Sequence, residues 1–444
     1  MTETSNPPAT VSDPRLQKEL QQRLDREAGR GGKFFSPDRL KAALPLILVL
    51  AFGALYPLLA DNEGAMQIRG WPAVGEFFPH TASCVTILVF TMMAVGLNVV
   101  VGYAGLLDLG YVAFYAAGAY VAGWFASQQF EQVSFHFGAV GVSPTLPGIH
   151  ISIWPILLLA GVFTGVVGIL IGLPTLRLRG DYLAIVTLGF GEIVPQVVRN
   201  ADSVGGFDLT HGTFGITPID SPGFGEGLSN ATGGFLPVAF SRSFDKDNLY
   251  YWTALSLLLV TIYCCWRLRD SRLGRAWIAI REDETAAAAM GIPLMRTKTW
   301  AYAIGAFFGG IAGAFYASSK SGAFPSDFYF NISIFLLCMV ILGGMGSIWG
   351  VVVAGVILGW LNFEGLAVIG TKLNHNVFNP LGTSIDVPKY QFGIYGVILV
   401  TMMLFRPTGL IPERRRKLEM EEGTHDEAVH GELHGIGTHK GPGT

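Results

Sequence analysis

Long apolar runs recur along this chain and constrain its fold more than any other feature. The longer runs approach the length of about 20 residues that a helix needs to cross about 30 Å of hydrocarbon. Half of the residues are hydrophobic, only 14% are charged and the mean hydropathy is +0.44. Too few polar residues remain to cover the surface of a soluble domain of this length. The sequence therefore predicts an all-α integral membrane protein.

Breaks at charged or Gly/Pro-rich segments divide the apolar residues into about ten predicted transmembrane helices. These helices form a membrane domain at 43–406, which follows a polar arm at 1–42 and precedes a basic tail at 407–444 that we expect to be disordered. Two long connections stand out, at 199–248 and at 267–297. The predicted spans are 44–60, 84–101, 109–126, 151–173, 182–198, 249–266, 299–318, 331–342, 351–368 and 392–405.

Positive charges lie mainly in every second connection. Of the 30 Lys and Arg residues, 23 fall in the arm, the tail, the short loop at 177–179 and the loop at 267–298. Because basic loops stay on the cytoplasmic side, this pattern predicts that both termini and the 267–297 loop are cytoplasmic and that the 199–248 loop is external. The net charge of −3 gives no indication of a nucleic-acid partner.

Glycines recur four residues apart within several spans, which predicts close packing between helix backbones rather than contact with a substrate. A further glycine-rich stretch at 343–350 separates the eighth and ninth spans and is compatible with a tight turn or with a broken helix. The glycine stripes are 161/165, 168/172, 305/309/313 and 355/359.

Motifs for catalysis or nucleotide binding are missing from the sequence. It contains no GxxxxGK[ST] phosphate loop, no HExxH and no CxxC. All four cysteines lie within apolar runs, where they behave as small hydrophobic residues. We therefore expect no enzyme activity, no metal and no cofactor in this chain.

The 267–297 loop combines charge with helix propensity. Glu282, Asp283 and Glu284 precede a run of alanines, and Gly291 follows it as a stop signal. This pattern predicts one short helix on the cytoplasmic face. Such a helix is either a docking surface for a groove in another protein or a solvated connector.

Polar residues within or near the hydrophobic layer are candidates for a translocation path. An ionisable group at this depth costs several kcal/mol unless it faces water or a partner. Glu192 lies inside the fifth predicted span, where it either lines a path or locks two helices as a polar pair. Asp108 lies in a glycine-rich break, either at depth or in a cytoplasmic turn, and Asn98 lies inside the second span.

An ordered series of segments resembles the permease subunits of ABC importers for branched-chain amino acids, of the LivM type. The likeness extends over nearly the whole membrane region. Its segments are GLNVVVG at 96–102, GYVAFYAAGAY at 110–120, LRLRGDYLAIVTLGFGE at 176–192, LGRAW at 273–277, REDE at 281–284, LGGMGS at 342–347 and RPTGLIP at 406–412.

The resemblance implies a bacterial inner-membrane complex with several partners. They are a second, LivH-like permease subunit, two cytoplasmic ATPase subunits that bind the ATP, and a periplasmic protein that delivers leucine, isoleucine or valine. In such importers the 267–297 loop carries a coupling helix that is seated in the ATPase. The expected coupling residues are therefore Arg275, Arg281, Glu282, Asp283, Glu284 and Gly291.

Two positions depart from the family pattern. His211 stands where the external loop often has the second residue of a Thr-Gly-Gly-x-x-Gly run, and Asp108 stands where a small polar or apolar residue is common. Two alternatives stay open on the sequence. One is the same machinery for urea, short amides or other amino acids, and the other is a proton-coupled carrier that uses Glu192 and Asp108 as a relay.

Overall fold

The computed structural model describes most of the membrane domain. It describes residues 53, 55–57, 78–143, 145–178, 180–203, 205–232, 237–240, 246–375 and 386–411. The chain divides into two compact units, 1–58 and 59–444, and the fold below is that of the second unit. The predicted arm, most of the first span and nearly all of the tail lie outside the described residues.

The described part of the chain is mainly helical, and its helices correspond to the second to tenth predicted spans. Eight helical segments are long and apolar enough to cross a membrane, and the ninth, α5, is shorter. The all-α membrane fold is thereby confirmed. The segments are α4 (Thr81–Asn98) with η1 (Val99–Tyr103), α5 (Val112–Phe125), α6 (Ile153–Thr175), α7 (Asp181–Arg199), α9 (Lys246–Arg269), α12 (Leu294–Ser319), α13 (Asn331–Gly343), α14 (Ile348–Trp360) with η5 (Leu361–Gly365) and α15 (Leu366–Leu373), and α16 (Gln391–Phe405).

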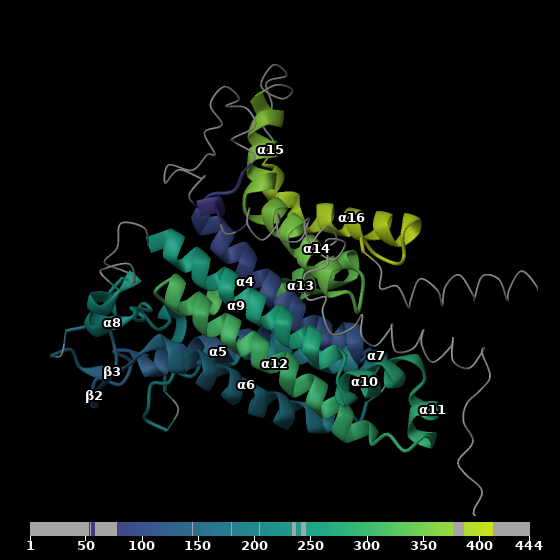
Figure 1. The fold of residues 1–444 in the computed structure, drawn as a ribbon, viewed down its shortest axis with the longest axis horizontal. Helices are drawn as coiled ribbons and strands as arrows, with labels where there is room; N and C mark the ends of the chain where they lie inside the picture. Colours follow the sequence, from purple (N-terminus) through teal and green to yellow (C-terminus); the bar gives the residue numbers. More distant parts are fainter. Residues whose placement is uncertain are drawn as a thin grey trace, which may run out of the picture. The chain divides into compact units, whose positions relative to one another are not determined.

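Helices α4 and α12 form the centre of the bundle, where α12 packs against α4, α5 and α6 (Figure 1). The glycine stripes lie at these contacts and at the contact between α14 and α4, as predicted. A Cβ atom on Gly168 would lie 2.8 Å from the Cβ of Ala306 in α12, and one on Gly355 would lie 2.7 Å from the Thr91 hydroxyl oxygen in α4. Only glycine therefore allows these helix backbones to approach so closely.

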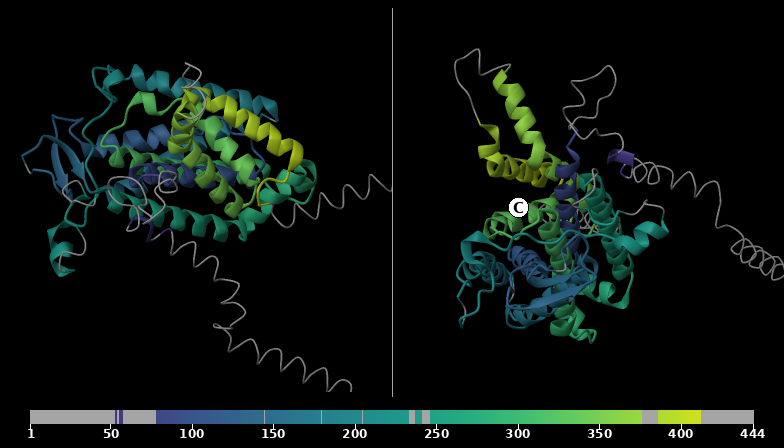
Figure 2. Two further views of the ribbon diagram at one scale, coloured as in Figure 1. Left: turned by 90° about the horizontal axis from the view of Figure 1, so that it is seen from above. Right: turned by 90° about the vertical axis from the view of Figure 1, so that its left-hand side faces the viewer.

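A small cap covers one end of the bundle and contains strands that the apolar pattern did not predict. In its sheet, β3 (Gly148–Ile151) pairs antiparallel with β1 (Ala126–Ser127) and parallel with β2 (Ser134–Phe137). His150 joins β3 to the long 199–248 loop, because its Nδ1 lies 2.8 Å from Oδ2 of Asp220. Figure 2 shows the sheet and helix α8 (Gly225–Ala231) gathered at this end.

The glycine-rich stretch at 343–350 forms a tight turn and not a broken helix. Gly344 and Gly346 have φ values of 105° and 89°, which favour glycine. Ser347 then begins α14, because its hydroxyl oxygen accepts a hydrogen bond from the Gly350 N–H at 3.2 Å. The reversal is complete within a few residues, so α13 and α14 pack against each other.

Candidate functional site

The 267–297 loop folds into two helices, so the expectation of a single helix was wrong. Helix α10 covers Arg272–Glu282 and α11 covers Glu284–Ala289. Asp283 between them has extended backbone dihedrals, and its Oδ1 accepts hydrogen bonds from the N–H groups of Thr285 at 2.7 Å and Ala286 at 3.0 Å. An aspartate that caps a new helix competes with continuation of the preceding one.

Gly291 ends α11 as its position predicted. Its φ of 83° is the left-handed conformation that often terminates helices. The amide of Gly291 donates to the carbonyl oxygen of Ala288, and the next amide, of Ile292, donates to that of Ala287. The loop can therefore turn back directly into α12.

The two short helices are attached firmly to the bundle. Trp277 of α10 is fully buried, and its Nε1 donates to the Thr297 carbonyl oxygen at 2.8 Å. Glu284 of α11 forms an ion pair of 2.9 Å with Lys298 of α12, whose side chain is only 5% exposed. The pair holds Glu284 against the bundle, although its side chain is still 30% exposed. A coupling role for Glu284 stays a prediction.

Arg281 also points inward rather than into solvent. Its Nη1 donates a hydrogen bond to the carbonyl oxygen of Gly102, in the π-helical segment η1. A Cβ atom on Gly105, which has a φ of 68°, would lie 2.6 Å from Cγ of Arg281. A side chain at Gly105 would therefore displace Arg281.

Asn98 continues this connection into the bundle. Its Oδ1 accepts a hydrogen bond of 2.9 Å from the N–H of Gly346, and the residue is 1% exposed. Asn98 thus joins α4 to the turn between α13 and α14. A role for Asn98 in the translocation path stays a prediction.

The outward surface of the loop carries the other predicted coupling residues. Arg275, Glu282, Asp283 and Gly291 are all exposed. Three hydrogen bonds, from the Thr285 hydroxyl and two backbone amides, lower the pKa of Asp283. Met290, at the end of α11, is 84% exposed. Met290 was not among the residues predicted from the sequence. A methionine at the end of an alanine run was a usable signal, since flexible thioethers are common at binding surfaces.

Asp108 lies in the connector between η1 and α5 and is fully buried. Its Oδ1 accepts a hydrogen bond of 2.8 Å from the Gly110 N–H. Burial raises the pKa of this carboxyl group to about 6, although the Gly110 amide and the Tyr302 phenol act in the opposite direction. Next to it, the Leu109 N–H donates to the hydroxyl of Thr187 in α7 at 3.0 Å.

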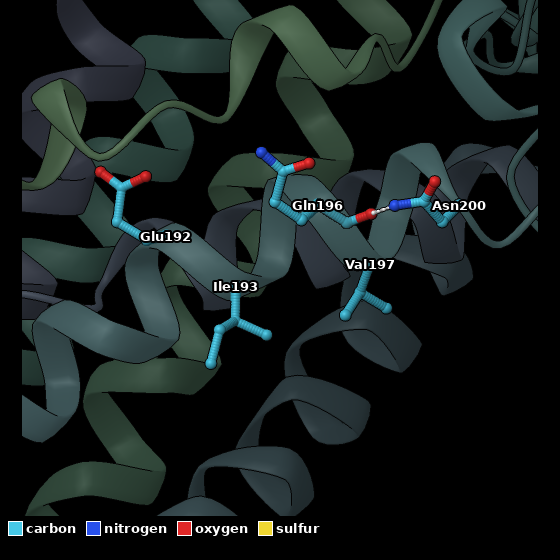
Figure 3. Close-up of a pocket in the computed structure, with 5 residues that line it drawn as sticks. All are labelled: Glu192, Ile193, Gln196, Val197 and Asn200. Atoms are coloured by element: carbon cyan, nitrogen blue, oxygen red, sulfur yellow. Dashed lines mark hydrogen bonds between the residues drawn. The ribbon is translucent and has the colours of Figure 1, made fainter.

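Glu192 lies on the exposed side of α7, away from the connector that holds Asp108. The buried side of this helix faces the connector, since a Cβ atom on Gly191 would lie 3.3 Å from the Leu109 carbonyl oxygen. The structure therefore does not bring Glu192 and Asp108 together. Figure 3 shows the shallow hollow along the exposed side, which is lined by Glu192, Ile193, Gln196, Val197 and Asn200.

Glu364 is a further carboxylate within a span and was not among the candidates predicted from the sequence. It lies in the π-helical segment η5 and is 9% exposed, and its Oε1 lies 2.8 Å from both the N–H and Nδ1 of His80. Nearby, the Tyr395 hydroxyl donates to Oδ1 of Asn362 at 2.7 Å. The available signal in the sequence was the pair of polar residues, Asn362 and Glu364, within an apolar run. The structure places both in a π-helical turn, a feature that often marks functional sites.

Comparison with known proteins identifies the family. The family described as "Branched-chain amino acid transport system / permease component" matches residues 81–403, which is most of the chain. The chain belongs to this permease family. Together with the apolar helices described above, the match makes it a multi-pass membrane protein.

Several relatives of this permease are known by name. It is 37% identical over 406 residues to the high-affinity branched-chain amino acid transport system permease protein LivM of Salmonella typhimurium, covering 88% of this chain and 81% of the relative. Identity to LivM of Escherichia coli is 33% over the same shares. LivH of Salmonella typhimurium is 28% identical over 39% of this chain and 49% of the relative. No solved structure matches the permease.

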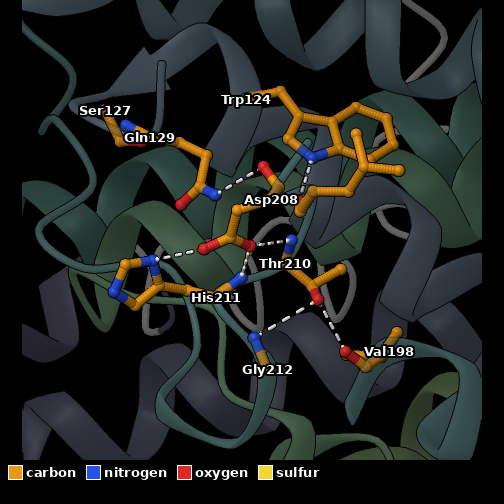
Figure 4. A network of polar contacts seen from close by, with 9 residues as sticks. Trp124, Ser127, Gln129, Val198, Asp208, Thr210, His211 and Gly212 are labelled. Atoms are coloured by element: carbon orange, nitrogen blue, oxygen red, sulfur yellow. Dashed lines mark hydrogen bonds and ion pairs between the residues drawn. The ribbon is translucent and has the colours of Figure 1, made fainter. Parts of the chain in front are cut away.

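The 199–248 loop of the permease explains one departure from the family pattern. His211 has a φ of 58°, the left-handed conformation in which glycine is favoured. Asp208 holds it there, because its Oδ1 accepts from the His211 N–H at 2.7 Å and its Oδ2 lies 3.0 Å from the His211 Nδ1 (Figure 4). The loop is tied to the bundle by a hydrogen bond of 2.7 Å from Trp124 to the Leu209 carbonyl oxygen.

Proposed function

We propose that this permease is the membrane subunit of an ABC importer that carries branched-chain amino acids across the bacterial inner membrane. In this proposal both termini are cytoplasmic, a LivH-like second permease completes the path, two separate ATPase subunits bind and hydrolyse ATP, and a periplasmic protein delivers leucine, isoleucine or valine. The substrates named for the LivM and LivH relatives support the cargo. The construction of the α10–α11 loop supports coupling to an ATPase.

The loop is attached to the bundle on one side and exposed on the other, which is the arrangement that mechanical coupling requires. The outward side presents Met290 with the charged groups of Arg275 and Glu282. The inward side is held through Trp277 and Arg281. A groove in the ATPase that binds the outward side would displace the ends of α4 and α12, and rigid-body rocking of these helices would alternate access to the path.

Reconstitution into vesicles tests this proposal. The permease alone should transport no amino acid under a proton gradient, whereas the complex with the second permease, the ATPases and the periplasmic protein should take up leucine on ATP hydrolysis. Uptake by the permease alone under a proton gradient would instead support a secondary carrier. Uptake of urea or an amide but not leucine by the full complex would show that the importer assignment is right and that its substrate is not a branched-chain amino acid.

A double substitution tests the docking surface itself. Met290→Asp with Glu282→Lys alters only exposed groups, so we expect the double variant to fold normally. Its affinity for the ATPase should fall about tenfold or more. Both residues are changed because a single exposed charge contributes little to binding, whereas an apolar contact within the interface contributes more. Glu226→Lys, on exposed helix α8 at the other end of the bundle, is the matched control. Normal ATPase binding by the double variant would contradict the assignment of the loop.

A further inference from the structure

The exposed side of α7 differs from that of its neighbour α6. Helix α6 exposes only apolar side chains at a four-residue spacing, among them Val162 and Val166, as expected for contact with lipid. Helix α7 also exposes apolar side chains, among them Ile193 and Val197. It differs from α6 in that Glu192, Gln196 and Arg199 follow at spacings of four and three residues, which places them along one side of the helix. In Figure 3 the side chains of Glu192 and Gln196 point in the same direction.

The position of Glu192 opposes contact with hydrocarbon. Glu192 lies about 16 Å along a helix of about 28 Å, from the rise per residue of an α-helix, and is therefore far from both ends. An ionisable group at that depth costs several kcal/mol in lipid. Among the residues that the structure describes, no hydrogen bond or ion pair to the Glu192 carboxylate is found. The side of α7 that carries Glu192 is therefore expected to face water or a polar partner.

The outer end of the same side carries a positive charge. Arg199 lies seven residues beyond Glu192, about 10 Å along the helix. Its Nη2 donates to the Tyr329 hydroxyl at 2.8 Å, and its guanidinium lies 5.4 Å from the centre of that ring. The hydroxyl accepts from one of the five N–H donors of the guanidinium, so others are able to bind a carboxylate.

We infer that the exposed side of α7 is the wall of a wet path for a zwitterionic amino acid, on which Arg199 receives the carboxylate of the solute and Glu192 its ammonium group. The separation of about 10 Å exceeds the size of one amino-acid head group, so the two residues act in succession. This inference rests on the proposed function, because the other wall of the path is the second permease. It favours a zwitterion over uncharged urea or an amide, because each charged residue meets an opposite charge.

Thiol labelling tests whether this side is wet and whether Glu192 sets its local charge. In the complete complex, with exposed Cys264 changed to alanine as the parent, Gln196→Cys should react with water-soluble methanethiosulfonates. Position 196 lies four residues after Glu192 and three before Arg199, so adding Glu192→Gln leaves only the positive charge nearby and should lower the ratio of cationic to anionic reaction rates about tenfold. Val166→Cys, on the apolar side of α6, should react with neither reagent. An unreactive cysteine at 196, or a rate ratio that Glu192→Gln leaves unchanged, would overturn the inference.

Transport measurements test the role of the carboxylate. Glu192→Gln should lower ATP-driven leucine uptake about tenfold or more, since the variant loses a charge-assisted hydrogen bond to the ammonium group of the solute. Glu192→Asp should restore part of the uptake. Glu131→Gln, which removes an exposed carboxylate from the external cap, should leave uptake unchanged. Normal uptake by Glu192→Gln would overturn the inference, and so would dissociation of its complex, since Glu192 would then serve assembly.

These results separate the inference from the proposed function. If the unmodified complex takes up leucine and the α7 variants behave like it, only the inference fails. If the unmodified complex takes up no amino acid, the proposed function fails, whatever the labelling shows.

Discussion

The guanidinium of Arg281 donates a hydrogen bond to the carbonyl oxygen of Gly102, which joins surface helix α10 to the end of α4. Of the spanning helices that the structure describes, the one formed by α4 and η1 is the most buried. Asn98, one turn earlier, binds the turn between α13 and α14 through Gly346. These two hydrogen bonds therefore connect α10 to three spanning segments, α4, α13 and α14.

In the proposed importer, Arg281→Ala should uncouple transport from ATP hydrolysis without preventing ATPase binding. Loss of a hydrogen bond from a charged donor costs about 1.5–3 kcal/mol, so the melting temperature in detergent should fall by several degrees. Leucine uptake per ATP hydrolysed should fall as well. Arg275→Ala, which removes an exposed arginine of the same helix, should leave the melting temperature almost unchanged. Equal uptake per ATP in the Arg281 variant and the unmodified protein would contradict a coupling role.

The ion pair between Glu284 and Lys298 should be important mainly for the protein's own stability. Glu284→Gln leaves the buried ammonium of Lys298 without its carboxylate, which should destabilise the loop by about 1–3 kcal/mol, below the value for a fully buried pair because Glu284 is 30% exposed. Replacing both residues, with Lys298→Met added, should recover much of this loss. Thermal unfolding of the single and double variants measures it, and a double variant less stable than Glu284→Gln would contradict this account.

Asp108 should make stability depend on pH. Burial raises its pKa from 3.8 to about 6, so the folded protein retains this proton while the unfolded chain loses it between pH 4 and 6. The contribution of Asp108 to the free energy of unfolding is therefore highest below pH 4 and decreases as the pH rises to 6. Above pH 6 the free energy of unfolding stays about 3 kcal/mol lower than below pH 4. Asp108→Asn keeps an acceptor for the Gly110 amide and does not titrate.

The measurement is the difference in melting temperature between Asp108→Asn and the unmodified protein. We expect almost no difference at pH 4 and a higher melting temperature for the variant at pH 7. Asp108→Ala, which also loses the bond to Gly110, controls for the hydrogen bond. A difference that does not change between pH 4 and 7 would show that Asp108 does not titrate in this range.

His211→Gly should be tolerated, because the left-handed backbone at this position strains any residue other than glycine by about 1 kcal/mol or more. The ion pair with Asp208 that is lost is largely exposed and contributes little. His211→Val should lower the melting temperature, since a β-branched side chain is poorly accommodated at positive φ. If the glycine variant proves the less stable of the two, the histidine side chain stabilises the loop more than its backbone strains it.

The sequence by itself determined the membrane fold, the positions of the second to tenth spans and the location of the surface loop. These features depend on local composition: apolar runs of sufficient length, glycines four residues apart and charged breaks. It also predicted the stop at Gly291, because a glycine after a helical run adopts the left-handed conformation that ends it. The first span and the two termini stay predictions.

Only the tertiary structure decided which side chains point inward. The helix break at Asp283 sets the directions of Arg281 and Glu284, and their partners Gly102 and Lys298 lie on other helices. The exposure of Glu192 follows from which side of α7 packs on the connector. Periodicity gives the spacing of residues along a helix, whereas the side that is buried depends on contacts between segments far apart in the sequence.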